Sequence, residues 1–170
     1  MWYVVYKVQN ASPSLFTRLD EQGIEYHVPM HYTEKLNHDG TMMEQKKVAS
    51  INNLIFINTS MNILQLVQQT NGLLAPMKDT MTDMPAVVRD DEMKRFIKIQ
   101  ELKPADVTLL KDPYSKFMDK GKVRVKAGIF EGIEGRIVRI RRDKKLVISL
   151  GNMAVAISGI HYSLLEPITD

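Results

Sequence analysis

The sequence contains no cysteine, which excludes disulfides, thiolate metal sites and cysteine nucleophiles together. It also lacks an uninterrupted apolar run of the roughly 18 residues that a membrane-spanning helix needs. Residues 1–7 carry neither a basic leader nor a small-residue cleavage site, so no secretory signal is expected. These absences favour a cytoplasmic protein.

Residue clusters that carry chemistry are also scarce. His27 and His31 lie four positions apart in an expected strand, where they share a face but are too distant for easy chelation. The acidic residues 90–92 are better explained as the start of a helix than as a metal site. Residues 128–132 lack the Lys-Ser/Thr ending of a phosphate-binding loop. We therefore expect no catalytic residue, metal or cofactor, and a protein that is not an enzyme.

Charge is divided unevenly along the chain, whose net charge is +3. Residues 1–119 hold 13 basic and 15 acidic side chains, whereas residues 120–170 hold 10 basic and 5 acidic ones. This asymmetry suggests two modules, the second facing a polyanion or an acidic protein surface. The basic run 139–145 has two interpretations: a solvated hairpin that keeps a strand edge from aggregating, or a contact with nucleic acid or an acidic surface.

The first module shows the element order β-α-β-β-α-β, followed by a third helix. Aromatic and β-branched residues, cap residues and turn glycines place its elements. We expect strands over residues 2–8, 24–33, 48–58 and 73–77, helices beginning near Ser12, Ser60 and Asp90, and a loop or hairpin tip at residues 37–40. This order is that of the ferredoxin-like split βαβ, in the α+β class.

In such a sheet the first two helices cover one face, and the first and third strands lie in the middle. Alternation places Trp2, Val4 and Tyr6 on one side of the first strand, and Leu54 with Phe56 on one side of the third. Parity alone leaves open which set points away from the helices. Because one helical layer cannot cover so many large apolar side chains, we expect an uncovered apolar patch that binds a partner.

The last fifty residues contain short strands and no helical pattern. Five segments alternate or are rich in β-branched residues, at positions 123–126, 137–140, 146–150, 154–158 and 164–168. They predict a small, closed, five-stranded β-barrel. Pro104 and Pro113 bracket a connecting segment, so we expect an N-terminal domain over residues 1–103, a linker over 104–119 and a barrel over 120–170.

Residues 121–137, with the sequence GKVRVKAGIFEGIEGRI, resemble a KOW motif, which occurs in SH3-like barrels of ribosomal proteins and of the NusG family. In this motif Gly128 and Gly132 permit a tight backbone, and Phe130 anchors the loop. Gly135 lets the next strand begin at close approach.

The first module resembles the same family. Residues 2–6 are similar to the opening of the NusG N-terminal domain, and residues 23–30 to its second-strand signature. Residues 51–57 stand where the family has a Phe-Pro-Gly-Tyr-hydrophobic segment, here without its proline and aromatic. The resemblance extends over residues 2–168, and it is strongest to specialised NusG paralogs of the RfaH or UpxY kind.

This resemblance implies a bacterial transcription elongation and antitermination factor that acts as a monomer away from membranes. The N-terminal domain would bind the clamp helices of the largest RNA polymerase subunit and suppress pausing and termination. The KOW domain would recruit Rho or the ribosome, and nascent RNA or non-template DNA are further candidate partners. Such a factor acts by preferring one polymerase conformation.

The resemblance also implies which residues make these contacts. Polymerase binding falls on Val4, Tyr6, Ile51, Leu54 and Phe56. Binding of the KOW partner or of nucleic acid falls on Phe130, Lys122, Arg124, Lys126 and Arg139. Arg18 is the candidate DNA contact on the first helix.

An RNA-recognition module is the alternative from another class, because it uses the same split βαβ and places aromatics on its first and third strands. Its third strand needs a Lys/Arg-Gly-aromatic-small-aromatic pattern, which residues 49–56 lack. The net negative first module also opposes phosphate binding. A ribosome-associated protein that binds RNA through its KOW barrel is a further alternative, and sedimentation would distinguish these cases.

Overall fold

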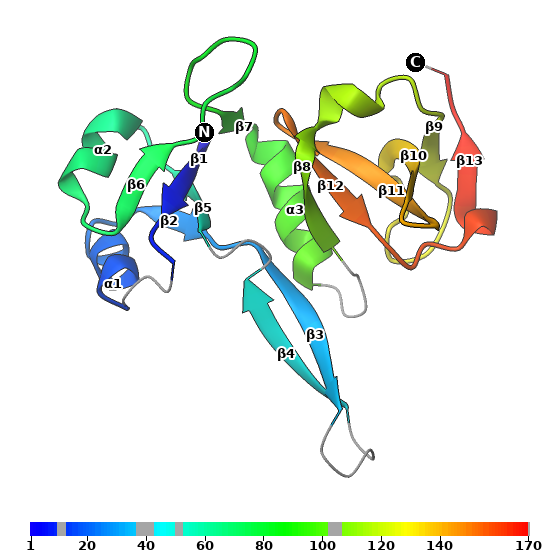
Figure 1. Ribbon diagram of the computed structural model, residues 1–170, viewed down its shortest axis with the longest axis horizontal. Helices are drawn as coiled ribbons and strands as arrows, with labels where there is room; N and C mark the ends of the chain where they lie inside the picture. The colour runs from blue at the N-terminus through cyan, green and yellow to red at the C-terminus, as the bar shows by residue number, and fades with distance from the viewer. Residues whose placement is uncertain (10–12, 37–42, 50–52, 102–106, 170) are drawn as a thin grey trace.

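The computed structural model describes residues 1–9, 13–36, 43–49, 53–101 and 107–169. It consists of an N-terminal α+β module and a β-rich C-terminal module, with one helix between them (Figure 1). The helices are α1 (Pro13–Glu21) and α2 (Ile63–Gln69) in the N-terminal module, and α3 (Asp90–Glu101) at the junction.

The N-terminal sheet is antiparallel, with the strand order β2-β5-β1-β6 and β7 paired to β1. Its strands are β1 (Trp2–Lys7), β2 (Glu25–His27), β5 (Leu54–Asn58), β6 (Leu73–Pro76) and β7 (Val87–Val88). The expected first and third strands are therefore the central pair, with Val4 opposite Phe56 and Tyr6 opposite Leu54. The ferredoxin-like order predicted from the sequence is confirmed.

The strand expected over residues 24–33 is divided in the structure. β2 ends just before Pro29, which has no N–H to donate to a ladder, and the chain then leaves the sheet. β3 (Met30–Leu36) and β4 (Met43–Ala49) pair with each other as a separate hairpin that projects from the module (Figure 1). The turn residues 37–40 lie outside the described residues, but the pairing of Leu36 with Met43 is that of a hairpin.

Local sequence signals account for most helix ends. α1 is followed by Gly23 at φ 65°, the left-handed stop expected there. α2 begins after Asn62 rather than Ser60, because the Asn62 side chain accepts hydrogen bonds from the backbone N–H groups of Leu64 and Gln65. α3 begins at Asp90 as predicted, and three acidic residues occupy its first turn.

The C-terminal sheet has six strands in the order β13-β9-β10-β11-β12-β8. The five predicted strands are confirmed as β9 (Lys122–Val125), β10 (Glu134–Ile140), β11 (Asp143–Leu150), β12 (Met153–Ile157) and β13 (Leu165–Pro167). Short 3-10 turns, η1 (Tyr114–Phe117) and η2 (Tyr162–Leu164), precede β9 and β13.

The sixth strand, β8 (Val107–Pro113), lies within the segment that the sequence analysis assigned to a linker. It pairs with β12, and its side chains Val107 and Leu109 are buried in the core. The assignment of a linker to this stretch was therefore wrong. Pro113 is tolerated because it ends a strand at the edge of the sheet.

The glycine positions of the KOW-like segment are confirmed. Gly128 and Gly132 have φ angles of 89° and 82°, which other residues adopt only with strain. A Cβ at Gly135 would lie 2.5 Å from the carbonyl oxygen of Val147, so the close approach is to β11. Phe130 is buried with an exposed fraction of 8%, as a loop anchor should be.

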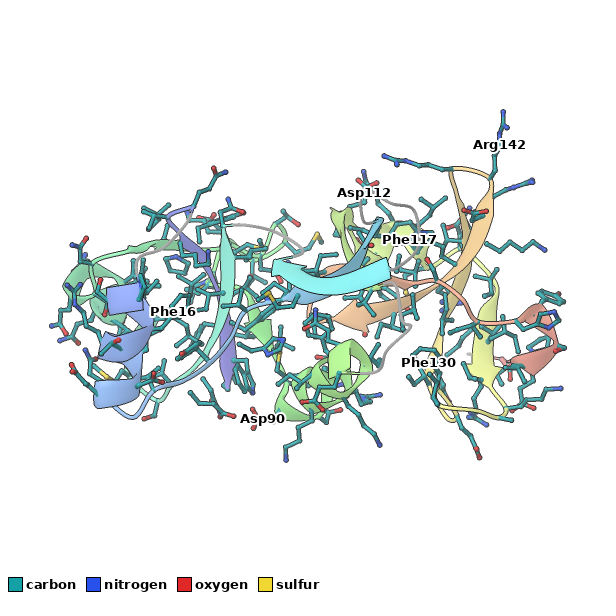
Figure 2. All side chains as sticks on the ribbon, turned by 90° about the horizontal axis from the view of Figure 1, so that it is seen from below. Phe16, Asp90, Asp112, Phe117, Phe130 and Arg142 are labelled. Atoms are coloured by element: carbon teal, nitrogen blue, oxygen red, sulfur yellow. The ribbon has the colours of Figure 1, made fainter. Side chains whose placement is uncertain are left out.

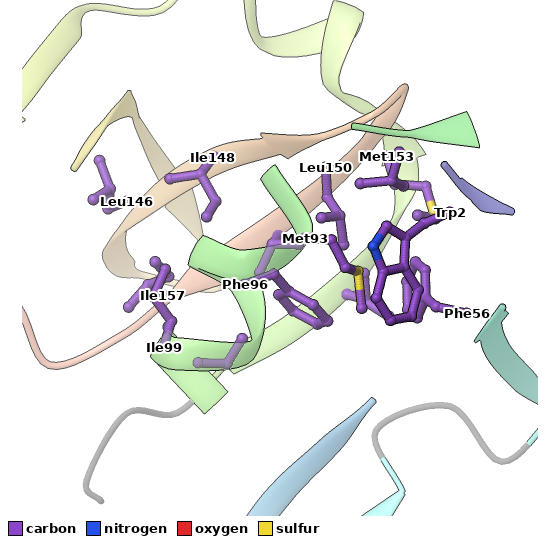
Figure 3. Close-up of a cluster of buried hydrophobic side chains, with 14 of the residues drawn as sticks. Trp2, Phe56, Met93, Phe96, Ile99, Leu146, Ile148, Leu150, Met153 and Ile157 are labelled. Carbon is purple, nitrogen blue, oxygen red and sulfur yellow. The ribbon is translucent and has the colours of Figure 1, made fainter. Parts of the chain in front are cut away.

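The largest apolar core belongs to both modules. One cluster of buried side chains continues from Trp2 and Phe56 in the N-terminal sheet, through α3, to Ile148 and Leu150 of β11 (Figure 3). A second cluster fills the space between the N-terminal sheet and helices α1 and α2. A third lies between the C-terminal sheet and η1.

Candidate functional site

The structure decides which face of the N-terminal sheet points away from α1 and α2. Val5, Ile55 and Ile57 belong to the core beneath these helices. Val4, Leu54 and Phe56 point to the opposite side, together with Trp2. The residues proposed for polymerase contact thus share one face, which we call the β1–β5 face: Val4, Tyr6, Leu54 and Phe56. Ile51 lies outside the described residues.

This face is covered, and the expectation of an open apolar patch was wrong. Val4, Leu54 and Phe56 have exposed fractions of 0%, 3% and 0%. The Phe96 ring of α3 lies 5.8 Å from the Phe56 ring and 5.9 Å from the His27 ring, between centroids. The reason is that α3 carries an apolar stripe that has to be buried somewhere, and the β1–β5 face is the apolar surface next to it.

Polar contacts also fix α3 to the N-terminal module. The buried Gln100 side chain donates from Nε2 to the carbonyl oxygen of Met30 at 2.7 Å, and its Oε1 lies within hydrogen-bond distance of His27 Nε2. A buried amide with both ends bonded holds a helix in one register. His27, considered above as a metal ligand, therefore takes part in the junction with α3.

On its other side α3 contacts the C-terminal module. Ser149 Oγ of β11 donates to Glu92 Oε1 at 3.2 Å, and Met93 belongs to the same core cluster as Ile148. The backbone of the β11–β12 turn approaches β7 so closely that a Cβ on Gly151 would lie 2.5 Å from the carbonyl oxygen of Val87. At Gly151 the modules therefore meet without space for an added methyl group.

Tyr6 is the described member of the β1–β5 face that remains half-buried. It lines a mainly apolar cavity of about 560 Å³ between the N-terminal sheet and the β8–β12 edge of the C-terminal sheet. Leu54, Leu109, Leu110 and Met153 line the same cavity. The margin of the face is thus accessible although its centre is covered.

The residues proposed for the KOW partner do not form a single site. Arg124 donates to Glu134 at 2.6 Å and lies 3.9 Å from Glu166, and Lys122 lies 3.8 Å from Glu134. The hydrogen bond with Arg124 lowers the pKa of Glu134 and raises that of Arg124. Lys126 is exposed.

Arg139, the last member of this set, is exposed far along β10 and makes no ion pair within the described part of the chain. Phe130 is buried, as noted above, so its side chain contributes to the loop rather than to a surface. Arg18 on α1 is exposed, and its Nη1 donates to the carbonyl oxygen of Asn71 at 3.4 Å. It lies in the N-terminal module, away from the barrel.

Two general features bear on the class of site. Among the described residues, no three His, Asp or Glu side chains converge in a way that could hold a metal ion. None of the helices described is long and apolar enough to cross a membrane. The β1–β5 face with its helix α3 is the feature that calls for a functional explanation.

Comparison with protein families identifies the chain. The family described as "Transcription termination factor nusG" matches residues 1–97, more than half of the sequence. The chain belongs to the NusG family. NusG proteins act in transcription, generally interact with RNA polymerase and are not enzymes.

A solved structure from Thermotoga maritima, "Domain interaction in Thermotoga maritima NusG", aligns with this NusG-family chain at a TM-score of 0.46 and 17% identity. The alignment covers 99% of this chain and 97% of that one. A search of curated proteins found no match.

Sequence reasoning identified the members of the β1–β5 face but not the residues that cover it. Helical spacing is enough to place Met93 and Phe96 on one apolar side of α3, but it does not show the core in which they are buried. The N-terminal sheet has a surplus of large apolar side chains, and α3 has an apolar stripe. Taken together, these two features indicate that α3 packs on the sheet.

Proposed function

We propose that this NusG-family protein is a transcription elongation factor and antiterminator that binds the clamp helices of RNA polymerase through the β1–β5 face. Bound there, it suppresses pausing and termination. The observation that carries the proposal is the composition of that face. Two central strands of a NusG-type sheet place contiguous apolar side chains on the side away from α1 and α2.

The way α3 is bound supports a helical partner. α3 presents Met93 and Phe96 to the β1–β5 face, so this surface already accommodates the apolar side of a helix. Recognition of an amphipathic helix by an apolar groove is a recurring binding mode. A clamp helix would take the place that α3 occupies in the structure.

Polymerase binding therefore requires α3 and the C-terminal module to move away from the β1–β5 face. A protein whose competent state is a minor population binds with an apparent affinity reduced by that fraction. The polymerase would drive the change through its preference for the open state, without any chemical step. The junction between the modules thus controls the affinity for polymerase.

The proposal is tested by titrating the full chain with a fragment that contains the clamp helices of the polymerase. Tyr6→Ala should weaken binding at least about tenfold, as truncation of an aromatic interface anchor often does. Tyr6 is preferable to the fully buried Phe56, since its half-buried ring can be removed with less effect on the core.

Tyr3→Ala is the matched control, because Tyr3 is also a half-buried tyrosine of β1 but packs against the core on the α1 and α2 side. It should leave the affinity unchanged. If folded Tyr6→Ala protein bound the fragment as tightly as the wild type, the β1–β5 face would not be the polymerase site.

We also propose that the barrel recruits a second partner, either Rho or the ribosome. The net positive charge of residues 120–170 supports a partner of opposite charge. Sedimentation of the full chain with Rho and, separately, with ribosomes distinguishes the two. If the chain sedimented with neither Rho nor ribosomes, this part of the proposal would be wrong.

A further inference from the structure

The β10–β11 hairpin carries a group of cations to which the proposed function gives no individual role. The hairpin extends beyond the body of the molecule, and Arg142 points outward from its tip (Figure 2). Arg139 and Lys144 lie on opposite strands just behind the tip. We call this group the hairpin cations: Arg139, Arg141, Arg142 and Lys144, which are exposed, and Lys145, which is half-buried.

No described carboxylate lies within ion-pair distance of these cations, although Asp143 belongs to the same hairpin. Lys122 and Arg124, in contrast, lie against Glu134. Arg139 and Lys144 are direct cross-strand partners, and like charges at such positions destabilise a sheet.

The turn itself adds a second cost. Ile140 pairs with Asp143, so Arg141 and Arg142 alone form the connection, with φ angles of 55° and 99°. A turn with two residues at positive φ strongly favours Asn-Gly, because these residues adopt left-handed conformations with little strain. Arginine at both positions lowers the stability of the turn but provides two exposed guanidinium groups, which suggests a functional reason.

An exposed aromatic ring lies beside these cations. Tyr162, in η2, has an exposed fraction of 66%, and Lys144 Nζ lies 4.9 Å from its ring centroid. η2 is held at its start by His161 Nδ1, which accepts a hydrogen bond from the backbone N–H of Ser163. The ring is thus presented on a defined turn, with a cation next to it.

We propose that the hairpin cations and Tyr162 form a binding surface for single-stranded nucleic acid. The cations would bind successive phosphates, and an unpaired base would stack on the Tyr162 ring. Single-stranded nucleic acid fits both features, because its phosphates match the cations and its unpaired bases can stack on the exposed ring. The surface is separate from the β1–β5 face and does not depend on polymerase binding.

The direct test is fluorescence anisotropy of the full chain with oligouridine, oligothymidine and duplex DNA, each of about 12 nucleotides or base pairs, the site size of a small barrel. Both single strands should bind with similar affinity, because phosphates and base faces are common to them. The duplex should bind more weakly, since its bases are already stacked. A preference for the duplex would overturn the proposal.

The first variant is the double substitution Arg141→Asn with Arg142→Gly, which installs the favoured turn and therefore should not unfold the hairpin. We expect at least about tenfold weaker binding of oligouridine at low salt. The slope of log affinity against log salt should fall by about 0.7 for each phosphate that the variant no longer binds.

The control is Lys94→Gln with Lys98→Gln, which removes the same charge from exposed positions on α3. An equally large decrease in affinity in both double variants would show that only net charge matters and would overturn the assignment to the hairpin.

The second variant tests the ring. Tyr162→Ala should weaken oligouridine binding at least about fivefold and leave duplex binding unchanged, while Tyr162→Phe should retain wild-type affinity because it keeps the stacking surface. If Tyr162→Ala had no effect on single strands, the ring would have no part in the site and the proposal would fail.

Discussion

Phe96 of α3 and Phe56 of β5 pack against each other with ring centroids 5.8 Å apart and planes inclined by 57°. Phe56 lies on the face proposed to bind polymerase, and Phe96 belongs to the core that continues into the C-terminal module. The Phe56 side chain is thus needed both for the junction of the two modules and for the contact with the proposed partner. Both uses cannot be satisfied at once, so the observed junction and the proposed polymerase contact exclude each other.

The contact between Gly151 and β7 offers a way to open this junction. A Cβ at Gly151 would lie 2.5 Å from the carbonyl oxygen of Val87, and φ at Gly151 is 62°. Gly151→Asn should keep the turn, since asparagine tolerates positive φ, but push the modules apart. We expect tighter binding of the clamp-helix fragment, by roughly tenfold for each 1.4 kcal/mol by which the junction is weakened.

Gly159→Asn is the control for this prediction, because Gly159 has φ 80° and a Cβ added there would lie within 4 Å of no other atom. It should leave the affinity for the fragment at the wild-type value. Unchanged affinity of the Gly151→Asn protein would mean that the junction does not limit polymerase binding.

Trp2 reports directly on the junction, since it is the sole tryptophan of the chain and is buried in the shared core near Phe56 and Met93 (Figure 3). Phe96→Ala leaves a cavity beside this core and should cost about 3–5 kcal/mol of unfolding free energy. Urea unfolding should show this decrease, and tryptophan emission should shift to longer wavelength.

Phe16→Ala removes the same side chain from the opposite side of the sheet, where Phe16 packs against Tyr26. Its effect on the emission of Trp2 should be small. A red shift of equal size in both variants would contradict the assignment of Trp2 to the α3 junction.

The strain in the β10–β11 turn predicts a gain in stability. Arg141→Asn with Arg142→Gly should raise the unfolding free energy by about 1 kcal/mol. The reason is that asparagine and glycine adopt the left-handed conformations of this turn with less strain than arginine. Gly132→Ala should lower the unfolding free energy, because alanine is strained at φ 82°. No other atom would contact the added Cβ, so the backbone strain alone is measured. Thermal unfolding of the two proteins measures both signs, and a decrease in stability of the turn variant would contradict the prediction.

Lys7 predicts a dependence of stability on pH. Its exposed fraction is 5%, and burial lowers the pKa of its ammonium group. The unfolded state then binds the proton more tightly than the folded state, so this residue destabilises the fold below the lowered pKa. The penalty is relieved as pH rises through that value towards the ordinary lysine pKa.

We therefore expect Lys7→Met to raise the unfolding free energy at neutral pH, with a gain over the wild type that shrinks as the pH rises. Urea unfolding of both proteins at neutral and alkaline pH measures this difference. Lys94→Met, at an exposed position of α3, should show no such trend. A gain that grew with pH would have the wrong sign for a lysine with a lowered pKa.

Local signals in the sequence were sufficient for the elements themselves. Gly23, Gly128 and Gly132 adopt positive φ where turns were expected, and the alternation in β1 correctly grouped Val4 with Tyr6. These features depend on neighbouring residues, through backbone sterics and the two-residue period of a strand. Pro113 misled the same kind of reasoning, because a strand at a sheet edge can end on a proline.

The tertiary structure alone decided what each face contacts. Alternation grouped Leu54 with Phe56 but could not show that α3 covers them, because hydrophobic burial is non-directional and any apolar surface within reach can satisfy it. The tertiary structure also decided which charged side chains are paired. Lys122 and Arg124 look as basic in the sequence as Arg141, yet only the fold places Glu134 beside the first two and leaves the third at an exposed hairpin tip.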